Sequence, residues 1–268
     1  MNIKNESYIT ILNNYFDKIF LLTIERNEER LKTTKKILHG LNYEIFFGVD
    51  GSKLDLAQLK KSGLVSNNID AIYEKSNIDY MNMPSPPIHI NQIACALSHV
   101  EIYKKIRSSG NFNRVLILED DTALVENNLQ HLSETLKQVP EDWEVLYLGH
   151  IINNNFSFWG KFKYYYLTHF IYRIGIRTKA IIRKKNTYPL PFSSLLKKQG
   201  AHIGTHAYAV KANAVDKLIK LQEPLEQVAP DLLLMDAIVK KIVISYSSKY
   251  VFFEQNPNLH SSIWSNQN

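Results

Sequence analysis

The stretch 18–51 constrains the fold more than any other part of the chain, because its hydrophobic pattern changes twice. The run "KIFLLTI" (18–24) predicts a strand, "NEERLKTTKKILHGL" (27–41) predicts a helix that Asn27 would cap, and "YEIFFGVDG" (43–51) predicts a second strand ending in a turn. A strand, a helix and a strand in this order favour a parallel sheet with helical crossovers. We therefore expect an α/β fold.

The rest of the chain supplies further strands and helices. A loop is expected at 81–89, where three prolines fall within four residues. The other predicted elements are a helix at 54–64, a helix at 91–110 that ends at Gly110, buried strands at 115–118 and 142–150, a strand followed by a helix within 204–221, a helix at 230–241 and short strands within 242–257. There are neither internal repeats nor low-complexity segments, so we expect one domain over residues 1–268.

Cysteine usage and the N-terminal stretch bear on the compartment. Cys95 is the only cysteine of the 268 residues, so the chain has no internal disulfide, which agrees with a reducing compartment. The first 20 residues carry charges and asparagines where a signal peptide needs an apolar core. No stretch approaches the roughly 18 apolar residues of a membrane span. We expect a soluble, cytoplasmic protein.

Positive charge is concentrated in one segment. The chain has a net charge of +6, yet no Asp or Glu occurs between Glu144 and Asp216, and that window holds 11 lysines and arginines. Its residues 161–185 interleave cations with aromatics, a composition that attracts polyanions such as nucleic acid, anionic lipid headgroups or phosphorylated glycolipid. A solvated basic face over core aromatics is the alternative. We expect residues 151–200 to be a basic insertion that faces the acceptor or a membrane.

Polar residues follow four of the predicted strands. They are Thr23, Glu25 and Arg26 after the first strand, Asp50 and Gly51 after the second, Glu119, Asp120 and Asp121 after "VLIL", and Gly149 and His150 after "DWEVLYL". In an open α/β sheet, ligands bind at the carboxyl ends of the strands. Four strands that place polar groups at one edge predict a ligand site there.

The three adjacent acids of "VLILEDDTAL" (115–124) need water or a positive partner, because burying an unpaired carboxylate costs several kcal/mol. Carboxylates suit Mg²⁺ or Mn²⁺, which complete their shells with substrate phosphates. The stretch therefore predicts a metal site for a diphosphate, with Arg26 and Arg30 as further positive charge. Helix capping is the alternative for the acids, and surface charge is the alternative for the arginines. The phosphate-binding motifs G-x-x-x-x-G-K and G-x-G-x-x-G are absent, which disfavours simple NTPases and dehydrogenases.

Four motifs, in this order, resemble glycosyltransferase family 25, the bacterial lipooligosaccharide galactosyltransferase-type enzymes. The stretch 19–51 is similar to the opening of that family, and "ACALSHVEIYKKI" (94–106) is similar to its G-C-A-x-S-H helix, with Ala94 in place of glycine. "VLILEDDTAL" resembles its acidic motif, and "GTHAYAV" (204–210) resembles a later strand. The resemblance spans about residues 18–240, within which residues 151–200 match no motif.

The resemblance implies a GT-A-like, Rossmann-like fold and a UDP-sugar donor, usually UDP-galactose, bound with Mn²⁺ or Mg²⁺. Carried over by position, Glu119 and Asp121 are similar to the D-x-D pair that holds the metal, with Glu in place of the first Asp. The resemblance also implies that Ser98 and His99 lie near the donor. Together with the polar and charged residues near the strand ends, the candidate donor-site residues are Thr23, Arg26, Arg30, Asp50, Gly51, Ser98, His99, Glu119 and Asp120. For His99, a buried core histidine is the alternative.

The resemblance also implies an inverting transfer, which needs a general base to take the proton of the acceptor hydroxyl. The candidates are Asp231 and Asp236 near the start of the predicted helix. An N-cap is the alternative for Asp231, and a place within the helix is the alternative for Asp236. His206 is a candidate contact of donor or acceptor, and His260 is a candidate nitrogen ligand of the metal.

We therefore expect a metal-dependent glycosyltransferase that extends a lipooligosaccharide or another surface glycan. The acceptor would be a glycolipid or oligosaccharide, reached by peripheral contact with the anionic cytoplasmic face of the inner membrane. One alternative is a non-enzymatic module that binds nucleic acid or anionic lipid through residues 161–198. That alternative leaves the strand-end acids unexplained, and we do not expect nucleic acid as a partner. A degenerate, inactive glycosyltransferase is disfavoured by the intact acids.

Overall fold

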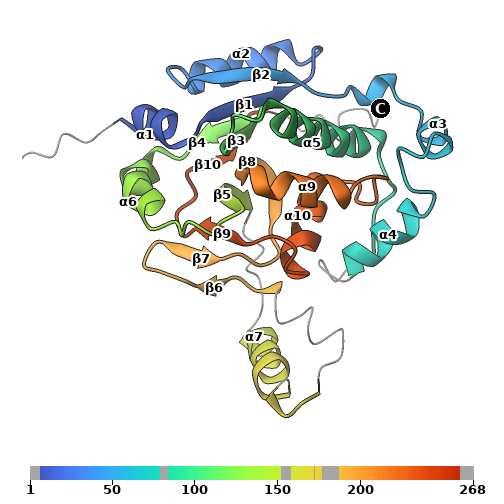
Figure 1. The fold of residues 1–268 in the computed structure, drawn as a ribbon, viewed down its shortest axis with the longest axis vertical. Helices are drawn as coiled ribbons and strands as arrows, with labels where there is room; N and C mark the ends of the chain where they lie inside the picture. Colours follow the sequence, from blue (N-terminus) through green and yellow to red (C-terminus); the bar gives the residue numbers. More distant parts are fainter. Residues whose placement is uncertain (1–6, 79–83, 152–157, 172, 177–186, 260–268) are drawn as a thin grey trace, which may run out of the picture.

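The computed structural model describes residues 7–78, 84–151, 158–171, 173–176 and 187–259. An eight-stranded sheet forms its centre (Figure 1). Across the sheet, the strands are β2 (Tyr43–Phe47), β1 (Lys18–Thr23), β3 (Arg114–Glu119), β8 (Ile203–Lys211), β5 (Val145–Ile151), β9 (Ser245–Ser248), β7 (Leu196–Lys198) and β6 (Leu190–Pro191). A separate antiparallel pair is formed by β4 (Thr122–Leu124) and β10 (Phe253–Gln255).

The strand directions confirm the predicted mixed, mostly parallel sheet. β1 pairs in parallel with both β2 and β3, and only β8 and β7 run against the other strands of the sheet. The antiparallel strand between β3 and β5 is not foreseen by the β-α-β pattern. Because β8 runs the other way, its first residues lie at the edge where β1, β3 and β5 end.

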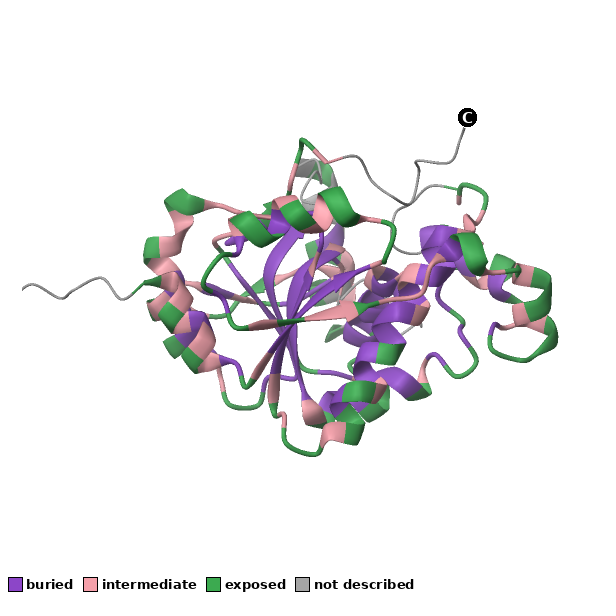
Figure 2. Ribbon diagram, turned by 90° about the horizontal axis from the view of Figure 1, so that it is seen from above, coloured by how far each residue is buried: buried purple, intermediate pink, exposed green. Residues whose placement is uncertain are grey.

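Helices cover both faces of the sheet (Figures 1 and 2). On one face lie α1 (Tyr8–Tyr15), α2 (Glu28–Ile37) and α6 (Leu132–Lys137), and on the other lie α5 (Ile90–Ser109), α9 (Ala212–Lys220) and α10 (Pro230–Val239). The smaller elements are the 3₁₀ turns η1 (Gly51–Lys53) and η3 (Glu126–His131), the helices α3 (Leu56–Lys61), α4 (Ile69–Ser76) and α7 (Phe158–Tyr165), and the π-helical turn η4 (Tyr166–Ile171).

The central strands are buried on both faces, which explains why their sequences are continuously apolar. In β1, Ile19 and Leu21 pack in the core with α1 and α6, whereas Phe20 and Leu22 pack in the core with α5 and α9. Figure 2 shows these strands as the buried middle layer. Strands with both faces covered expose polar groups mainly at their ends, and the site lies at such an end.

Several predicted boundaries shift in the structure. α5 ends as predicted, at Gly110 in the left-handed conformation (φ 67°) that glycine adopts without strain. α2 ends at Ile37, before the predicted residue 41, and β2 ends at Phe47, before the predicted residue 51. Asn27 occupies the N-cap position of α2 but its side chain caps no backbone amide, because its Nδ2 donates to Asp120 Oδ2 (3.1 Å).

The predicted basic insertion, residues 151–200, contributes two kinds of element. Its residues 190–198 form β6 and β7 at one side of the sheet, and α7 with η4 extends away from the body of the molecule (Figure 1). Residues 152–157, 172 and 177–186 of the insertion lie outside the described part. That the whole chain is one domain with an insertion at 151–200 stays a prediction. None of the helices in the described ranges has the length and apolar character needed to cross a bilayer.

Candidate active site

Two adjoining compartments open at the edge where the parallel strands end. The first has a volume of about 100 Å³ and lies between the β1–α2 loop, the turn after β2 and the N-terminal half of α5. The second has a volume of about 620 Å³ and lies between the starts of β8 and α10 and the segment after β10. Four residues line both compartments: Cys95, Glu119, Asp121 and Gln255. The predicted ligand site therefore has two parts that meet at the acidic triplet.

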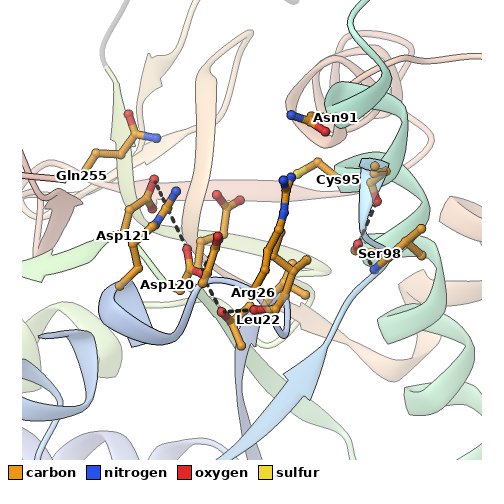
Figure 3. Close-up of a pocket in the computed structure, with 16 residues that line it drawn as sticks. Leu22, Arg26, Asn91, Cys95, Ser98, Asp120, Asp121 and Gln255 are labelled. Atoms are coloured by element: carbon orange, nitrogen blue, oxygen red, sulfur yellow. Dashed lines mark hydrogen bonds and ion pairs between the residues drawn. The ribbon is translucent and has the colours of Figure 1, made fainter. Parts of the chain in front are cut away.

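Figure 3 shows the walls of the first compartment. Asp120 and Asp121 lie on one side, and Asn91, Cys95 and Ser98 of α5 lie on the other, with Arg26 between them. Thr23, Arg30 and Gly51, three further donor-site candidates, also line this compartment. A Cβ atom added to Gly51 would come within 2.2 Å of Asn91 Oδ1 and 3.0 Å of Asn91 Cα, so a larger residue here would displace the Asn91 side chain and press on the first turn of α5.

Asp120 is bound to the wall formed by β1 and α2. Its Oδ2 accepts hydrogen bonds from Thr23 Oγ1 (2.6 Å) and Asn27 Nδ2 (3.1 Å). Its Oδ1 lies 2.6 Å from Arg30 Nη2, and its backbone carbonyl accepts a hydrogen bond from Thr34 Oγ1 (2.5 Å). Both carboxylate oxygens are thus engaged by protein groups. Asp120 orients the loop that carries the triplet and neutralises Arg30.

Asp121 presents an unsatisfied oxygen to the compartments. Its Oδ2 lies 3.1 Å from Arg30 Nη2, but its buried Oδ1 accepts no hydrogen bond from any described residue. Burial raises the pKa of this carboxyl to about 7, and the charge of Glu119 adds to that effect. A buried carboxylate oxygen without a donor is a suitable ligand for a cation, so the residues present fit a divalent metal here.

Glu119 lies at the end of β3, opposite α5 and β8. Its Oε1 accepts a hydrogen bond from Thr205 Oγ1 (2.7 Å) and lies 3.4 Å from His99 Nε2. Burial acts to raise the pKa of the Glu119 carboxyl, but His99 and Thr205 outweigh burial and hold that pKa below its ordinary value. The same environment therefore keeps Glu119 ionised and favours a proton on Asp121.

The other donor-site candidates form the support behind this compartment. Arg26 Nε lies 3.3 Å from Asp50 Oδ1, and Asp50 also accepts a hydrogen bond from the Ser52 amide (2.9 Å). Ser98 Oγ accepts a hydrogen bond from the Val49 amide (2.8 Å) and donates one to the Ala94 carbonyl (2.7 Å). Ser98 thus ties α5 to the loop after β2, with its own side chain at the compartment wall.

The two candidate bases occupy different environments on α10. Asp231 lines the second compartment, where its Oδ1 accepts a hydrogen bond from the Leu232 amide (2.8 Å) and its Oδ2 one from the Gly204 amide (3.5 Å). The N-cap of α10 is Ala229, so the N-cap alternative for Asp231 is wrong. Asp236 is buried within the helix beside Lys240 (2.5 Å) and lines neither compartment.

The histidines predicted for the site lie behind it or outside the described residues. His99 is fully buried, with its Nδ1 2.7 Å from the Tyr208 hydroxyl. His206 is buried with Nε2 3.1 Å from the Phe253 carbonyl, and His150 is buried and stacks on His202 with ring centroids 4.5 Å apart. His260 lies outside the described residues. None of the three described histidines lines either compartment.

The structure adds residues that sequence reasoning did not assign to the site. Cys95 and Thr205 lie within two of the motifs without a predicted role, although the spacing of four residues between Cys95 and His99 indicates a shared helix face. The sequence pattern predicts Asn27 only as a helix cap. Gln255 has no local signal, because β10 brings it to the site from a distant part of the chain.

The charge balance of the two compartments favours a cation. The described residues that line them include four carboxylates, Glu119, Asp120, Asp121 and Asp231, and two arginines, Arg26 and Arg30. Arg30 is already paired with Asp120 and Asp121, and Arg26 with Asp50. A diphosphate would meet net negative charge at this edge unless a metal ion offset it.

Comparison with known proteins identifies the family. A search of curated protein sequences finds no match. The family model described as Glycosyltransferase family 25 (LPS biosynthesis protein) matches residues 16–234 of the 268, from the start of β1 into α10, and so includes all four motifs. The mixed α/β sheet flanked by helices agrees with a GT-A-like fold. The chain therefore belongs to glycosyltransferase family 25, and it is a glycosyltransferase of LPS biosynthesis that uses a sugar donor and a glycan acceptor.

Proposed function

We propose that this protein is a metal-dependent, inverting hexosyltransferase that uses a UDP-sugar, with UDP-galactose as the first candidate. The observation that carries this proposal is the junction of the two compartments at Glu119 and Asp121, with Asp231 in the second compartment. A donor in the first compartment and an acceptor in the second would meet at that junction. The choice of UDP and galactose rests on the family resemblance alone.

Glu119 and Asp121 are the residues that would hold the divalent ion. Support comes from the unsatisfied Asp121 Oδ1 and from the excess of carboxylates around the junction. The bound ion supplies the positive charge that stabilises a departing diphosphate. Arg26 lines the same compartment and would add positive charge near the diphosphate. Asp120 would act indirectly, by keeping Arg30 and the triplet loop in place.

Asp231 is the proposed general base. Burial raises the pKa of its carboxyl, which brings a carboxylate base closer to the pH at which proton transfer is efficient. Asp231 would take the proton of the acceptor hydroxyl while that oxygen forms a bond to the anomeric carbon. The bond from the anomeric carbon to the diphosphate breaks on the opposite side, which inverts the configuration.

The acceptor is proposed to be lipooligosaccharide or a related glycolipid at an anionic membrane surface. α7, η4 and the residues that follow expose a set of large apolar side chains: Trp159, Phe162, Tyr165, Tyr166, Phe170, Ile174 and Ile176. Trp159 is 74% exposed, which is unusual for so large an apolar side chain. With the acid-free basic window around them, these side chains suit the interface of an anionic bilayer.

A panel of nucleotide sugars incubated with the protein and Mn²⁺ tests the reaction class. We expect release of UDP from UDP-galactose, loss of release when EDTA removes the metal, and no release from Asp121→Ala that remains folded by circular dichroism. Near-normal turnover of Asp121→Ala would refute the metal assignment. If the nucleotide is released only from another nucleotide sugar, the assignment of the donor is wrong, but the protein is still a glycosyltransferase.

The alternative function, binding of nucleic acid through residues 161–198, predicts a different result. It requires salt-sensitive binding to nucleic acid that exceeds the binding to anionic vesicles of the same charge density. Preference for vesicles would leave the proposed membrane role standing.

A further inference from the structure

Cys95 and His99 lie on one face of α5, because residues four apart on a helix are neighbours. The same i, i+4 spacing presents the two histidine ligands of helix-borne zinc sites. Both side chains are directed at the end of β3, where Glu119 lies. One potential ligand atom from each residue, Cys95 Sγ, a ring nitrogen of His99 and a Glu119 carboxylate oxygen, lies within 4.8 Å of the other two. His99 Nε2 is the ring nitrogen that lies 3.4 Å from Glu119 Oε1.

The partners of the two ring nitrogens of His99 are those expected for a metal-ligating histidine. Its Nδ1 lies 2.7 Å from the Tyr208 hydroxyl, which in turn lies 2.7 Å from the Tyr103 hydroxyl. Its Nε2 is fully buried and makes no hydrogen bond with any residue of the described ranges, although Glu119 Oε1 is 3.4 Å away. Metal-ligating histidines have this arrangement, with one ring nitrogen fixed by a neighbour and the other presented to the ion.

We propose that Cys95, His99 and Glu119 form a binding site for a transition-metal ion of the Zn²⁺ type at the junction of the two compartments. A sulfur, a nitrogen and an oxygen ligand suit Zn²⁺ or Co²⁺ and not Mg²⁺. A tetrahedral ion needs its ligand atoms about 3.5 Å apart, so on binding the side chains of Cys95 and Glu119 would rotate to bring their ligand atoms closer together. Binding releases the thiol proton of Cys95 to solvent.

The fourth coordination position of this site would face the compartments, which Cys95 and Glu119 both line. Catalytic zinc sites have three protein ligands and keep the fourth position open to water or substrate, whereas structural zinc sites are closed. The core around α5 is complete without an ion, since Ile102, Tyr103 and Ile106 pack against the sheet. We therefore expect the fold to be independent of this metal.

The site has a consequence for turnover that rests on the proposed function. Glu119 belongs both to this site and to the proposed Glu119–Asp121 metal pair. An ion bound by Cys95, His99 and Glu119 withdraws that carboxylate from the pair, so Zn²⁺ should inhibit Mn²⁺-dependent transfer. Raising the Mn²⁺ concentration should relieve the inhibition.

Titration of the metal-free protein with Co²⁺ tests the site directly. A sulfur-to-cobalt charge-transfer band can come only from Cys95, because the chain has no other cysteine. We expect the band in the wild type and its loss in Cys95→Ser. Tyr208→Phe removes the hydroxyl that holds His99 Nδ1, so we expect its Co²⁺ affinity to be about 10–100-fold weaker. We expect a still larger loss of affinity in His99→Gln and no change in the exposed-histidine control His39→Gln.

Absence of the band in the wild type, or a band that His99→Gln leaves unchanged, would overturn the proposed site. Circular dichroism and thermal unfolding of each variant without metal establish that it is folded. Zn²⁺ inhibition is then measured against the zinc-free rate of each variant. If the cobalt band is present but Zn²⁺ does not inhibit, the site stands and the assignment of Glu119 to the catalytic metal pair fails.

Discussion

At the scale of single residues, the three adjacent acids have different partners and therefore different properties. Asp120 is satisfied by Thr23, Asn27 and Arg30, whereas Asp121 has an oxygen without a partner among the described residues. Glu119 faces α5 and β8 and receives a hydrogen bond from Thr205. The sequence shows three equivalent carboxylates, and their surroundings distinguish one structural acid from two candidate ligands.

The raised pKa of Asp121 predicts a pH-dependent stability difference. The folded protein keeps a proton on Asp121 up to about pH 7, whereas the unfolded chain releases it near its ordinary value of 3.8. This contribution to stability is therefore complete below pH 3.8 and is lost as the pH rises through about 7. Asp121→Asn should thus stabilise the metal-free protein at about pH 8, by on the order of 2–4 kcal/mol, and much less at about pH 5.

Thermal or urea unfolding in EDTA at both pH values measures this difference. The same variant should lose metal-dependent transfer, since an amide cannot replace the carboxylate as a metal ligand of equal charge. A stability difference that is equal at the two pH values would show that Asp121 does not titrate between them.

Kinetic measurements on variants can show which of Asp231 and Asp236 is the general base. Asp231→Asn should lower kcat by about 10²–10⁴ with a nearly unchanged KM for the donor, because only proton transfer from the acceptor is lost. In the wild type, kcat should fall as the pH falls through the raised pKa of Asp231, since the protonated acid is not a base. Asp236→Asn is the matched control on the same helix and should keep most of its turnover. A large loss in the control with a normal Asp231→Asn would reverse the assignment.

At the scale of elements, α5 serves both the core and the site. Its C-terminal half packs against the sheet through Ile102, Tyr103 and Ile106, and its N-terminal half presents Cys95 and Ser98 to the first compartment. The helix begins at the capping residue His89, whose amide donates to Gln92 Oε1 (2.9 Å). The capped start and the buried C-terminal half fix the rotation of α5 about its own axis. They thereby fix the direction in which Cys95 and His99 point.

The segment of α7 and η4 carries a prediction about membranes. Replacing Trp159, Phe162 and Phe170 together with serine should weaken binding to anionic vesicles by at least about tenfold, because each exposed aromatic loses about 1–2 kcal/mol of transfer energy. The melting temperature should hardly change, since these side chains are exposed. Leu64→Ser, which alters an exposed apolar residue between α3 and α4, is the control. Vesicle co-sedimentation measures the effect, and equal binding by the triple variant would exclude this surface as the docking face.

At the scale of the whole molecule, the site joins parts that are far apart in the chain. The two compartments are lined by the ends of β1 and β3, the start of β8, both α5 and α10, and the segment after β10. A ligand that binds at their junction should stabilise the whole fold. Mn²⁺ and UDP together should raise the melting temperature, with about 2.7 kcal/mol of stabilisation when the ligand is at 100 times its Kd.

That stabilisation should be much smaller with UDP alone and absent in Asp121→Ala. Differential scanning calorimetry at matched ionic strength distinguishes these cases. An equal shift in Asp121→Ala would mean that Mn²⁺ and UDP bind without the acidic triplet, and the metal pair would then have to be sought elsewhere.

The sequence by itself determined the local structure and the edge at which ligands bind. Short continuous apolar runs mark the central strands because both of their faces are buried, and a hydrophobic period of about 3.6 residues marks the helices because one face is buried. The β-α-β pattern makes the first strands parallel, and parallel strands end at one edge, so the polar residues after β1, β2 and β3 are brought to the same side. Gly149 and His150, predicted to follow the fourth strand, lie within β5 and line neither compartment. Four ordered motifs were also sufficient to indicate the family.

Tertiary structure alone decided which side chains meet. The pairing of Arg30 with Asp120 depends on how α2 packs on the sheet, and the contact of Glu119 with Thr205 depends on the antiparallel insertion of β8. The choice between Asp231 and Asp236 depends on which side of α10 faces the second compartment. Local periodicity encodes whether a residue is buried, but its partner is set by contacts between elements distant in sequence, and those contacts leave no local pattern.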